Sequence, residues 1–225
     1  VLPQLSKHIQ SKKKSKIHLI QNKALELSLF LTLPASAALL IASEEIISAL
    51  FGYGSFDQVS AINSGKALYY FALGLPAFSL IKVFSSFFFA NHDTKIPFYI
   101  SLFSVLINII ISISYFNEIG FIIIPIATTI SSWLNAILLF AFLKNRDLFS
   151  FNNIFLVRFV KIIIASLLMA IFFNFLITYF KYELAFNQNI KSFYLILSVI
   201  LSLLFYLFVS YWIKAFKTSD IKLKY

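Results

Sequence analysis

The chain has 225 residues, of which 60% are hydrophobic and only 12% are charged, and its mean hydropathy is +0.88. Since an average soluble domain is about 25% charged, this composition excludes an ordinary soluble enzyme and a disordered chain, and it predicts an integral membrane protein. The formal net charge is +10, and the absence of cysteine excludes a disulfide framework and a thiolate metal site. Position 1 is a valine and the single methionine is Met169, so we expect the sequence to begin partway through a longer protein.

Six stretches of the chain are nearly free of charge over the ~20 residues that a helix needs to cross a bilayer. They predict an all-α, polytopic membrane helix bundle with spans at Leu27–Ile46, Ala67–Ala90, Ile96–Phe116, Ile119–Leu143, Ile162–Phe180 and Ser192–Ile213. The expected organisation is the end of a preceding helix and a basic cytoplasmic linker, a four-helix part, and a final helix pair with a basic cytoplasmic tail, at residues 1–24, 25–148 and 149–225.

The basic residues are distributed unevenly about these spans. If the crossings alternate, one side of the membrane collects the lysines and arginines at positions 7–23, 95, 144–161 and 214–224. The other side has only Lys66, Lys181 and Lys191, and Lys82 lies inside the second span. The positive-inside rule places the richer side in the cytoplasm. Both ends are therefore predicted to be cytoplasmic, which agrees with an even number of spans.

The lysine run Lys12–Lys14 has two readings. It could contact nucleic acid, or it could be a solvated segment that sets topology and attracts anionic lipid headgroups. We favour the second reading because no aromatic residue interleaves with the lysines and a membrane span follows closely. We therefore expect membrane lipids as partners of this segment, and no nucleic acid.

The first span and the loop after it carry several local signals. A kink at Pro34 is tolerated in a membrane helix if neighbours satisfy the freed carbonyl. Glu44 and Glu45, at the outer end of this span, are interpreted as hydrated interfacial carboxylates rather than as a paired acid site, which would need an unidentified partner. In the longest outer loop, at 51–64, Ser55 or Asp57 can cap a short helix.

The next two connections are tight. Between the second and third spans the chain turns through Asn91–Lys95, where Asp93 or Thr94 can accept hydrogen bonds from the first amides of the third helix. Pro97 suits the first turn of that helix. The turn between the third and fourth spans, near 117–120, is shorter still, so these two helices are expected to be antiparallel neighbours.

Polar residues form one stripe on each of three spans, at helical spacing. The stripes consist of Ser79, Lys82 and Ser86 on the second span, Ser101, Ser104, Asn108 and Ser112 on the third, and Thr128, Ser132 and Asn135 on the fourth. Such faces either pack together through small hydroxyl residues or line a wet cavity. For the third and fourth spans we favour packing. The candidates for lining such a cavity and for contact with a ligand in it are Lys82, Ser79, Ser86, Asn108, Ser112, Thr128, Ser132 and Asn135.

Lys82 is the most unusual residue of the stripes. A charged side chain near the middle of a bilayer costs at least about 2.5–3.5 kcal/mol on insertion scales. Eight residues separate Lys82 from the end of its span at Ala90, which places it about 12 Å below the cytoplasmic end at 1.5 Å per residue. Its serine neighbours indicate a face that meets protein or water. Lys82 is either a cavity cation for an anionic group or a structural lysine.

No pattern for catalysis or for a metal site is present. His8, His18 and His92 lack metal-ligand spacing, and the sequence has neither a nucleophile elbow nor a P-loop. We therefore expect no enzyme activity, no cofactor and no metal. The last two spans are apolar on nearly every side, which fits either a peripheral helix pair that faces the bilayer or a groove for an acyl or prenyl chain.

The stretch ALYYFALGLPAFSLIKVFSSFFFANHDTKIP, residues 67–97, closely resembles a signature of the MurJ/MviN lipid II flippases, members of the multidrug/oligosaccharidyl-lipid/polysaccharide exporter superfamily. The matching positions are Ala67, Leu68, Tyr70, Gly74, Leu75, Pro76, Ala77, Phe78, Lys82, Val83, Ala90, Asp93, Thr94 and Pro97. Segments at 2–6 (LPQLS), 33–36 (LPAS) and 50–56 (LFGYGSF) match in order and spacing. Two positions depart from the family pattern: Tyr53, where arginine is frequent, and Ile96, where threonine is usual.

The resemblance implies the C-terminal portion of a two-lobed, 14-helix exporter that flips undecaprenyl-linked peptidoglycan precursor across the bacterial inner membrane by alternating access. This chain would supply the last six helices, with the N-terminal lobe and most headgroup-binding arginines elsewhere in the same protein. The resemblance also implies that the final helix pair forms a groove for the prenyl tail. Two alternatives stay open: an exporter of another lipid-linked oligosaccharide or a drug, and a non-transporting six-span assembly subunit.

Overall fold

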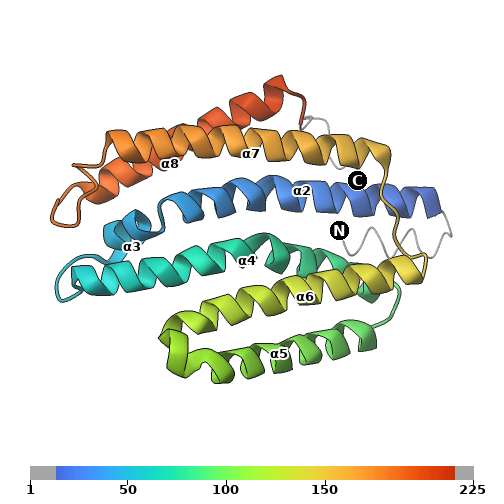
Figure 1. Ribbon diagram of the computed structural model, residues 1–225. Helices are drawn as coiled ribbons and strands as arrows, with labels where there is room; N and C mark the ends of the chain where they lie inside the picture. The colour runs from blue at the N-terminus through green and yellow to red at the C-terminus, as the bar shows by residue number, and fades with distance from the viewer. Residues whose placement is uncertain (1–13, 216–225) are drawn as a thin grey trace. The chain divides into compact units, whose positions relative to one another are not determined.

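The computed structural model describes residues 14–215, and in this range the chain forms α-helices joined by turns and one 3-10 helix, without a strand (Figure 1). The elements are α2 (Lys14–Ile41), α3 (Ser43–Phe51), α4 (Gln58–Ala90), α5 (Lys95–Ile119), η1 (Gly120–Ile122), α6 (Ile123–Asn145), α7 (Asn153–Tyr179) and α8 (Lys191–Trp212). The predicted all-α membrane helix bundle is confirmed. The segment at 2–6, His8, most of the Lys12–Lys14 run and the end of the basic tail lie outside the described residues.

Five segments of the described chain are long and apolar enough to cross a membrane: Ile17–Ile41, Gln58–Ala90, Lys95–Asn145, Asn153–Tyr179 and Lys191–Trp212. The third of them contains two helices, α5 and α6, joined by η1. The long helices therefore correspond one to one with the six spans expected from the sequence. The number of crossings and the side of each end stay predictions.

The predicted boundaries of the first span, Leu27–Ile46, are wrong. The helix α2 begins at Lys14 and ends at Ile41, and Ser43 starts the separate helix α3 after a break at Ala42. Hydropathy missed the start because the first turns of α2 carry polar and basic residues that a helix accommodates readily. At the other end, Glu44 and Glu45 lie in the first turn of α3, where negative charge is favourable beside the free amides.

By its internal contacts the chain divides into two compact units that interleave in sequence. Unit 1 combines Val1–Thr32 with Leu73–Val157, and unit 2 combines Leu33–Ala72 with Arg158–Tyr225. The helices α2, α4 and α7 each contribute residues to both units. The expected succession of a linker, a four-helix part and a final helix pair stays a prediction.

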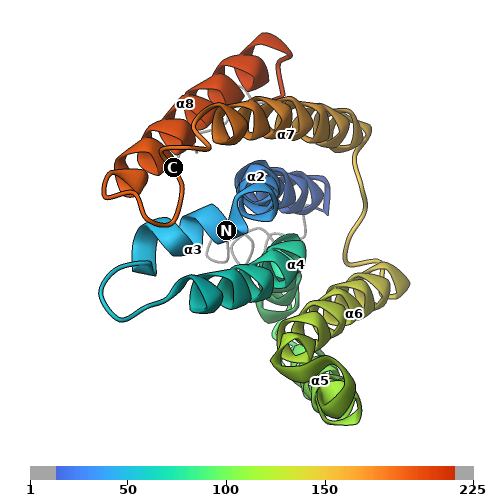
Figure 2. The same cartoon turned by 60° about the vertical axis from the view of Figure 1, so that its left-hand side comes forward.

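In unit 1, α5 and α6 form an antiparallel hairpin, as expected from the short turn between them (Figures 1 and 2). Gly120 ends α5 with a φ of +73°, a conformation that glycine adopts without a side-chain clash. The short helix η1 then leads directly into α6.

At the other end of unit 1, side-chain amides of α2 form hydrogen bonds with the backbone of the α6–α7 connection, and phenylalanine rings pack beside them. Gln21 of α2 donates from Nε2 to the carbonyl of Leu148 at 3.0 Å, and the side chain of Asn22 both donates to Ser150 O (2.8 Å) and accepts from the amide of Asn152 (3.2 Å). Nearby, Phe149 meets rings of α4, α6 and the following loop, namely those of Phe84, Phe87, Phe140 and Phe151. The connection from α6 to α7 is thereby held against α2 and α4.

Pro76 interrupts the hydrogen-bond ladder of α4, because a proline has no amide to offer the carbonyl four residues earlier. That carbonyl belongs to Ala72, and in unit 2 it accepts a hydrogen bond of 2.6 Å from the buried hydroxyl of Ser36. In unit 1 the next carbonyl, that of Leu73, accepts from the indole Nε1 of Trp133 at 3.0 Å. Side chains of other helices therefore satisfy the backbone at the proline, as membrane helices require.

In unit 2, aromatic rings join α7 and α8. Phe172 stacks on Phe205 with their ring centroids 4.6 Å apart, and the rings of Phe180 and Tyr194 lie 5.1 Å apart. Many other apolar side chains of the two helices are exposed, among them Ile171 and Phe208. Such surfaces suit contact with lipid acyl chains. The groove for a prenyl tail stays a prediction.

Candidate functional site

In the polar stripe of α4, the two serines have hydrogen-bond partners and the lysine has none among the described residues. Ser79 exchanges a hydrogen bond with Ser28 of α2, and Ser86 donates to the carbonyl of Val83 at 2.7 Å. Both serines are half-buried, whereas Lys82 is exposed and has no hydrogen bond or ion pair with any described residue. Of the stripe, only the Lys82 ammonium is free to meet another molecule.

The stripes of α5 and α6 meet each other. Asn108 donates from Nδ2 to the hydroxyls of Thr128 (3.0 Å) and Ser131 (3.3 Å), and Asn135 donates from Nδ2 to Ser101 Oγ (3.4 Å). These bonds cross the hairpin from one helix to the other. They favour interhelical packing over a wet cavity for these two helices.

The other stripe residues of the hairpin serve their own helices or have no partner. Ser104 is buried and donates to the carbonyl of Ile100, and Ser132 donates to that of Thr128. The hydroxyl of Ser112 is buried without a partner among the described residues. None of these residues reaches Lys82 through a described hydrogen bond.

Sequence reasoning missed two residues of this packing. Ser131 lies three residues after Thr128, at the spacing of the stripe, and could have been found by extending the pattern. Gly74 was noted only as a position of the family signature, and its spacing gave no sign of a packing role. A Cβ added there would lie 2.9 Å from Thr129 Oγ1 of α6, so Gly74 permits the close approach of α4 and α6.

The turn between α4 and α5 is capped by a carboxylate. Asp93 accepts from the amides of Lys95 (3.1 Å) and Ile96 (3.2 Å), which confirms one of the two expected caps. Thr94 occupies the N-cap position, but its side chain makes no capping hydrogen bond. The other oxygen of Asp93 pairs with Arg146 Nη1 at 2.8 Å, and Pro97 is buried in the first turn as expected.

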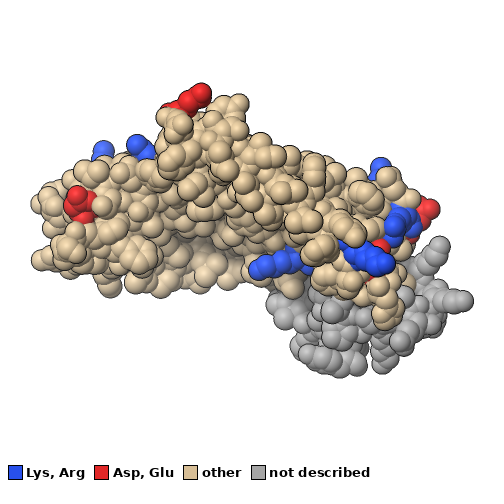
Figure 3. Space-filling view, turned by 90° about the horizontal axis from the view of Figure 1, so that it is seen from below, with Lys and Arg blue, Asp and Glu red and all other residues tan. Residues whose placement is uncertain are grey.

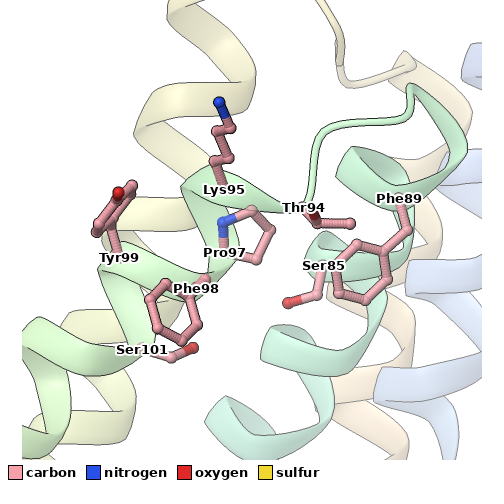
Figure 4. Close-up of a pocket in the computed structure, with 8 residues that line it drawn as sticks. All are labelled: Ser85, Phe89, Thr94, Lys95, Pro97, Phe98, Tyr99 and Ser101. Atoms are coloured by element: carbon pink, nitrogen blue, oxygen red, sulfur yellow. The ribbon is translucent and has the colours of Figure 1, made fainter.

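An open pocket of about 590 Å³ lies between α4 and α5, beside this turn (Figure 4). Its lining consists of Ser85, Phe89, Thr94, Lys95, Pro97, Phe98, Tyr99 and Ser101. The rings of Phe89 and Phe98 stand on its two sides, the hydroxyls of Ser85 and Ser101 lie between the helices, and the Lys95 chain extends from the rim (Figure 4). The pocket is mainly apolar, with small polar groups.

Lys82 lies on the α4 face that forms this pocket. Ser85 and Phe89 follow it by three and seven residues, which places all three on one side of the helix. Ser85 is one step of about 4.5 Å along the axis from Lys82 at 1.5 Å per residue. Lys82 is not part of the pocket lining, but it precedes the pocket on the same helix face.

Charge is scarce over the molecule in general. On the face in Figure 3, uncharged side chains cover most of the described surface, and lysines, arginines and acids occur only at scattered places. Within residues 14–215, no group of three or more histidine, aspartate or glutamate side chains could hold a metal ion.

The acids Glu44 and Glu45 differ in their surroundings. Glu44 is exposed, but Glu45 is half-buried, and burial raises the pKa of its carboxyl, with a smaller contribution in the same direction from the charge of Glu44. Farther along the loop, Asp57 accepts from the amide of Ser60 at 2.8 Å. Hydrogen bonding from the Ser60 side chain, and then from this amide, lowers the pKa of Asp57. Asp57 therefore caps the long helix α4, where a separate short helix was expected.

Comparison with known proteins gives a consistent result. The family model described as "Lipid II flippase MurJ" matches residues 1–195. A probable lipid II flippase MurJ of Rhizobium meliloti is 38% identical over 170 residues, which cover 76% of this chain and 32% of the relative. The lipid II flippase MurJ of Thermosipho africanus is 29% identical over 92% of this chain and 39% of its own. A solved structure titled as this flippase in an inward closed conformation superposes with a TM-score of 0.72 at 28% identity, over 92% of this chain and 40% of that one.

Proposed function

The chain belongs to the MurJ lipid II flippase family, and from this premise we propose that it forms the C-terminal part of a transporter that flips lipid-linked peptidoglycan precursor across the membrane by alternating access. It is a multi-pass protein of the bacterial inner membrane. The chain spans about a third of the length of the curated relatives it matches. The partner in transport is accordingly an N-terminal lobe of the same protein.

The observation that carries this proposal is the structural likeness over 92% of the chain to a lipid II flippase. It supports the flippase over an exporter of other substrates and over an assembly subunit without transport. The family is one of transporters and not of catalytic enzymes. We therefore assign this chain binding and conformational roles, with no bond made or broken.

Lys82 is the residue of this chain that we assign to the substrate. A lysine that faced lipid at this depth would cost at least about 2.5–3.5 kcal/mol, so the exposed side chain faces water or the rest of the protein. In a transporter that surface is the central cavity. There the ammonium offers a point charge to the diphosphate of the precursor, while Ser79 joins α4 to α2 and the polar stripes join α5 to α6.

The test uses the full-length protein with Lys82→Ala, and Lys66→Ala as the matched control, since Lys66 is an exposed lysine near the start of the same helix. Loss of a charge-assisted contact with a phosphate, about 1.5–3 kcal/mol, predicts precursor flipping slowed by about 10- to 100-fold in Lys82→Ala. Lys82→Arg should restore part of the rate, and Lys66→Ala should leave it unchanged.

Equal amounts of folded protein in the membrane show that the loss is functional. If Lys82→Ala flips precursor at the wild-type rate, the cavity role is wrong. If the wild-type protein flips no precursor at all, the transport proposal itself is wrong.

A further inference from the structure

A lysine at the start of α8 is buried without a carboxylate. Lys191 is 1% exposed, and none of the described residues places an acid within ion-pair distance of its Nζ. Its ammonium donates to the carbonyls of Gly52 (2.6 Å) and Phe186 (2.5 Å). The rings of Tyr53 and Phe186 stand over it, each with its centroid 4.5 Å away.

The carbonyls in this enclosure explain why a cation is stable there. Gly52 is the C-cap of α3, and the end of a helix carries free carbonyls and the negative end of the helix dipole. Aromatic faces add cation–π attraction, which strengthens when the cation is shielded from water. Lys191 therefore compensates the end of α3 in the way that a carboxylate compensates the start of a helix.

Its neighbour Ser192 makes a second bridge to the same helix. Ser192 Oγ donates to the carbonyl of Ala49 at 2.5 Å, and it lies 2.6 Å from the hydroxyl of Tyr53. Two consecutive residues at the start of α8 thus bind the last turn of α3 and the residue after its cap. All of these residues belong to unit 2.

Gly52 is adapted to this contact. A Cβ on Gly52 would lie 2.5 Å from the backbone oxygen of Ser48, 2.8 Å from a ring atom of Phe186 and 3.0 Å from Lys191 Nζ. A larger residue there would disturb the end of α3 as well as the ring and the ammonium. Gly52 therefore leaves room both for the backbone at the end of α3 and for Lys191, and its φ of −72° is ordinary.

We propose that Lys191 is a positioning residue that fixes the start of α8 on the C-terminal end of α3. This inference rests on the proposed function for its consequence: by holding the start of α8, Lys191 sets the position of the final helix pair, which would receive the prenyl tail of the precursor. The residue touches no substrate itself. Its effect is on tail binding, not on the headgroup.

Hydrogen–deuterium exchange of the full-length protein in lipid nanodiscs tests the anchor. The variants are Lys191→Met and Lys191→Arg, and the matched control is Lys181→Met, which removes an exposed lysine from the α7–α8 connection. We expect amide exchange in residues 51–57 to rise by about tenfold in Lys191→Met. It should rise less in Lys191→Arg and stay unchanged in Lys181→Met. Wild-type protection in Lys191→Met, or an equal rise in Lys181→Met, would overturn the anchor.

A transport assay tests the consequence. With precursors of full-length and shortened prenyl tails, Lys191→Met should raise KM for the long tail alone and leave kcat nearly unchanged, and Lys191→Arg should recover part of the affinity. An increase in KM for both tails, or for neither, would overturn the role in tail binding. Inactive wild-type protein would refute the proposed function, but the exchange comparison would still decide whether Lys191 anchors α8.

Discussion

Asp93 has two structural roles that substitutions can separate. One carboxylate oxygen caps α5 through the amides of Lys95 and Ile96, and the other pairs with Arg146. Loss of a capping side chain costs about 1 kcal/mol. The side chain of Arg146 is 51% exposed and that of Asp93 is 21% exposed, so solvent screens the ion pair, which should contribute only about 0.2–1 kcal/mol.

Three variants distinguish these contributions in the free energy of unfolding, measured by equilibrium denaturation in detergent micelles. Arg146→Ala should cost at most about 1 kcal/mol, and this cost should vanish near 1 M salt, where the Debye length is about 3 Å. Asp93→Asn should resemble Arg146→Ala, because asparagine retains an acceptor for the cap. Asp93→Ala should lose both contributions, about 1–2 kcal/mol, and should keep most of that loss at high salt. If Asp93→Asn is as destabilising as Asp93→Ala, the capping argument is refuted.

Two further predictions concern a kink and a buried acid. Ser36→Ala should lower the free energy of unfolding by about 1–2 kcal/mol, because it leaves the carbonyl of Ala72 without a partner beside Pro76. The control is Ser114→Ala, which changes an exposed serine. An equally small effect of both substitutions in equilibrium denaturation would contradict this interpretation. Burial raises the pKa of Glu45 above its unfolded value of 4.5, so the carboxylate weakens the fold at neutral pH and the penalty disappears as pH falls through the folded pKa. Glu45→Gln should therefore melt at a higher temperature than Glu44→Gln at pH 7. Glu44→Gln is the control because it also removes a charge from the first turn of α3, and the two melting temperatures should converge below about pH 4.5. Melting temperatures that stay parallel across this pH range would show that burial of Glu45 has no energetic effect.

The features that the sequence predicted well depend on neighbouring residues. The stripe of Asn108, Thr128 and Asn135 follows from helical spacing, and the short turn near Gly120 places the two stripes face to face. The cap at Asp93 depends on amides two and three residues away. Local spacing determines each of these contacts, so no knowledge of the tertiary arrangement is needed.

Helix ends were harder to predict, because hydropathy reports where lipid is and not where a helix stops. The helix α2 extends to Lys14 although its first turns are polar, and Gln21 and Asn22 are buried there by their bonds to the α6–α7 connection. A hydropathy window treats these amides as solvated loop residues. Their partners lie more than 120 residues farther along the chain, where no local pattern points to them.

Lys191 shows most clearly what a sequence cannot specify about a charge. By composition it is one of three basic residues on the sparsely charged side, equivalent to Lys66 and Lys181, and both of those are exposed in the structure. What makes Lys191 different is that the last turn of α3, 139 residues earlier, ends beside it and offers a carbonyl. The same reasoning applies in reverse to Lys82, whose depth in an apolar helix was visible from spacing alone but whose partner is not among the described residues. A buried lysine is stable where the fold supplies carbonyls, as at Lys191. An exposed lysine in an apolar helix is stable only where water or another part of the protein contacts it, as we infer for Lys82. Of Lys82 and Lys191, only Lys82 is available to a ligand.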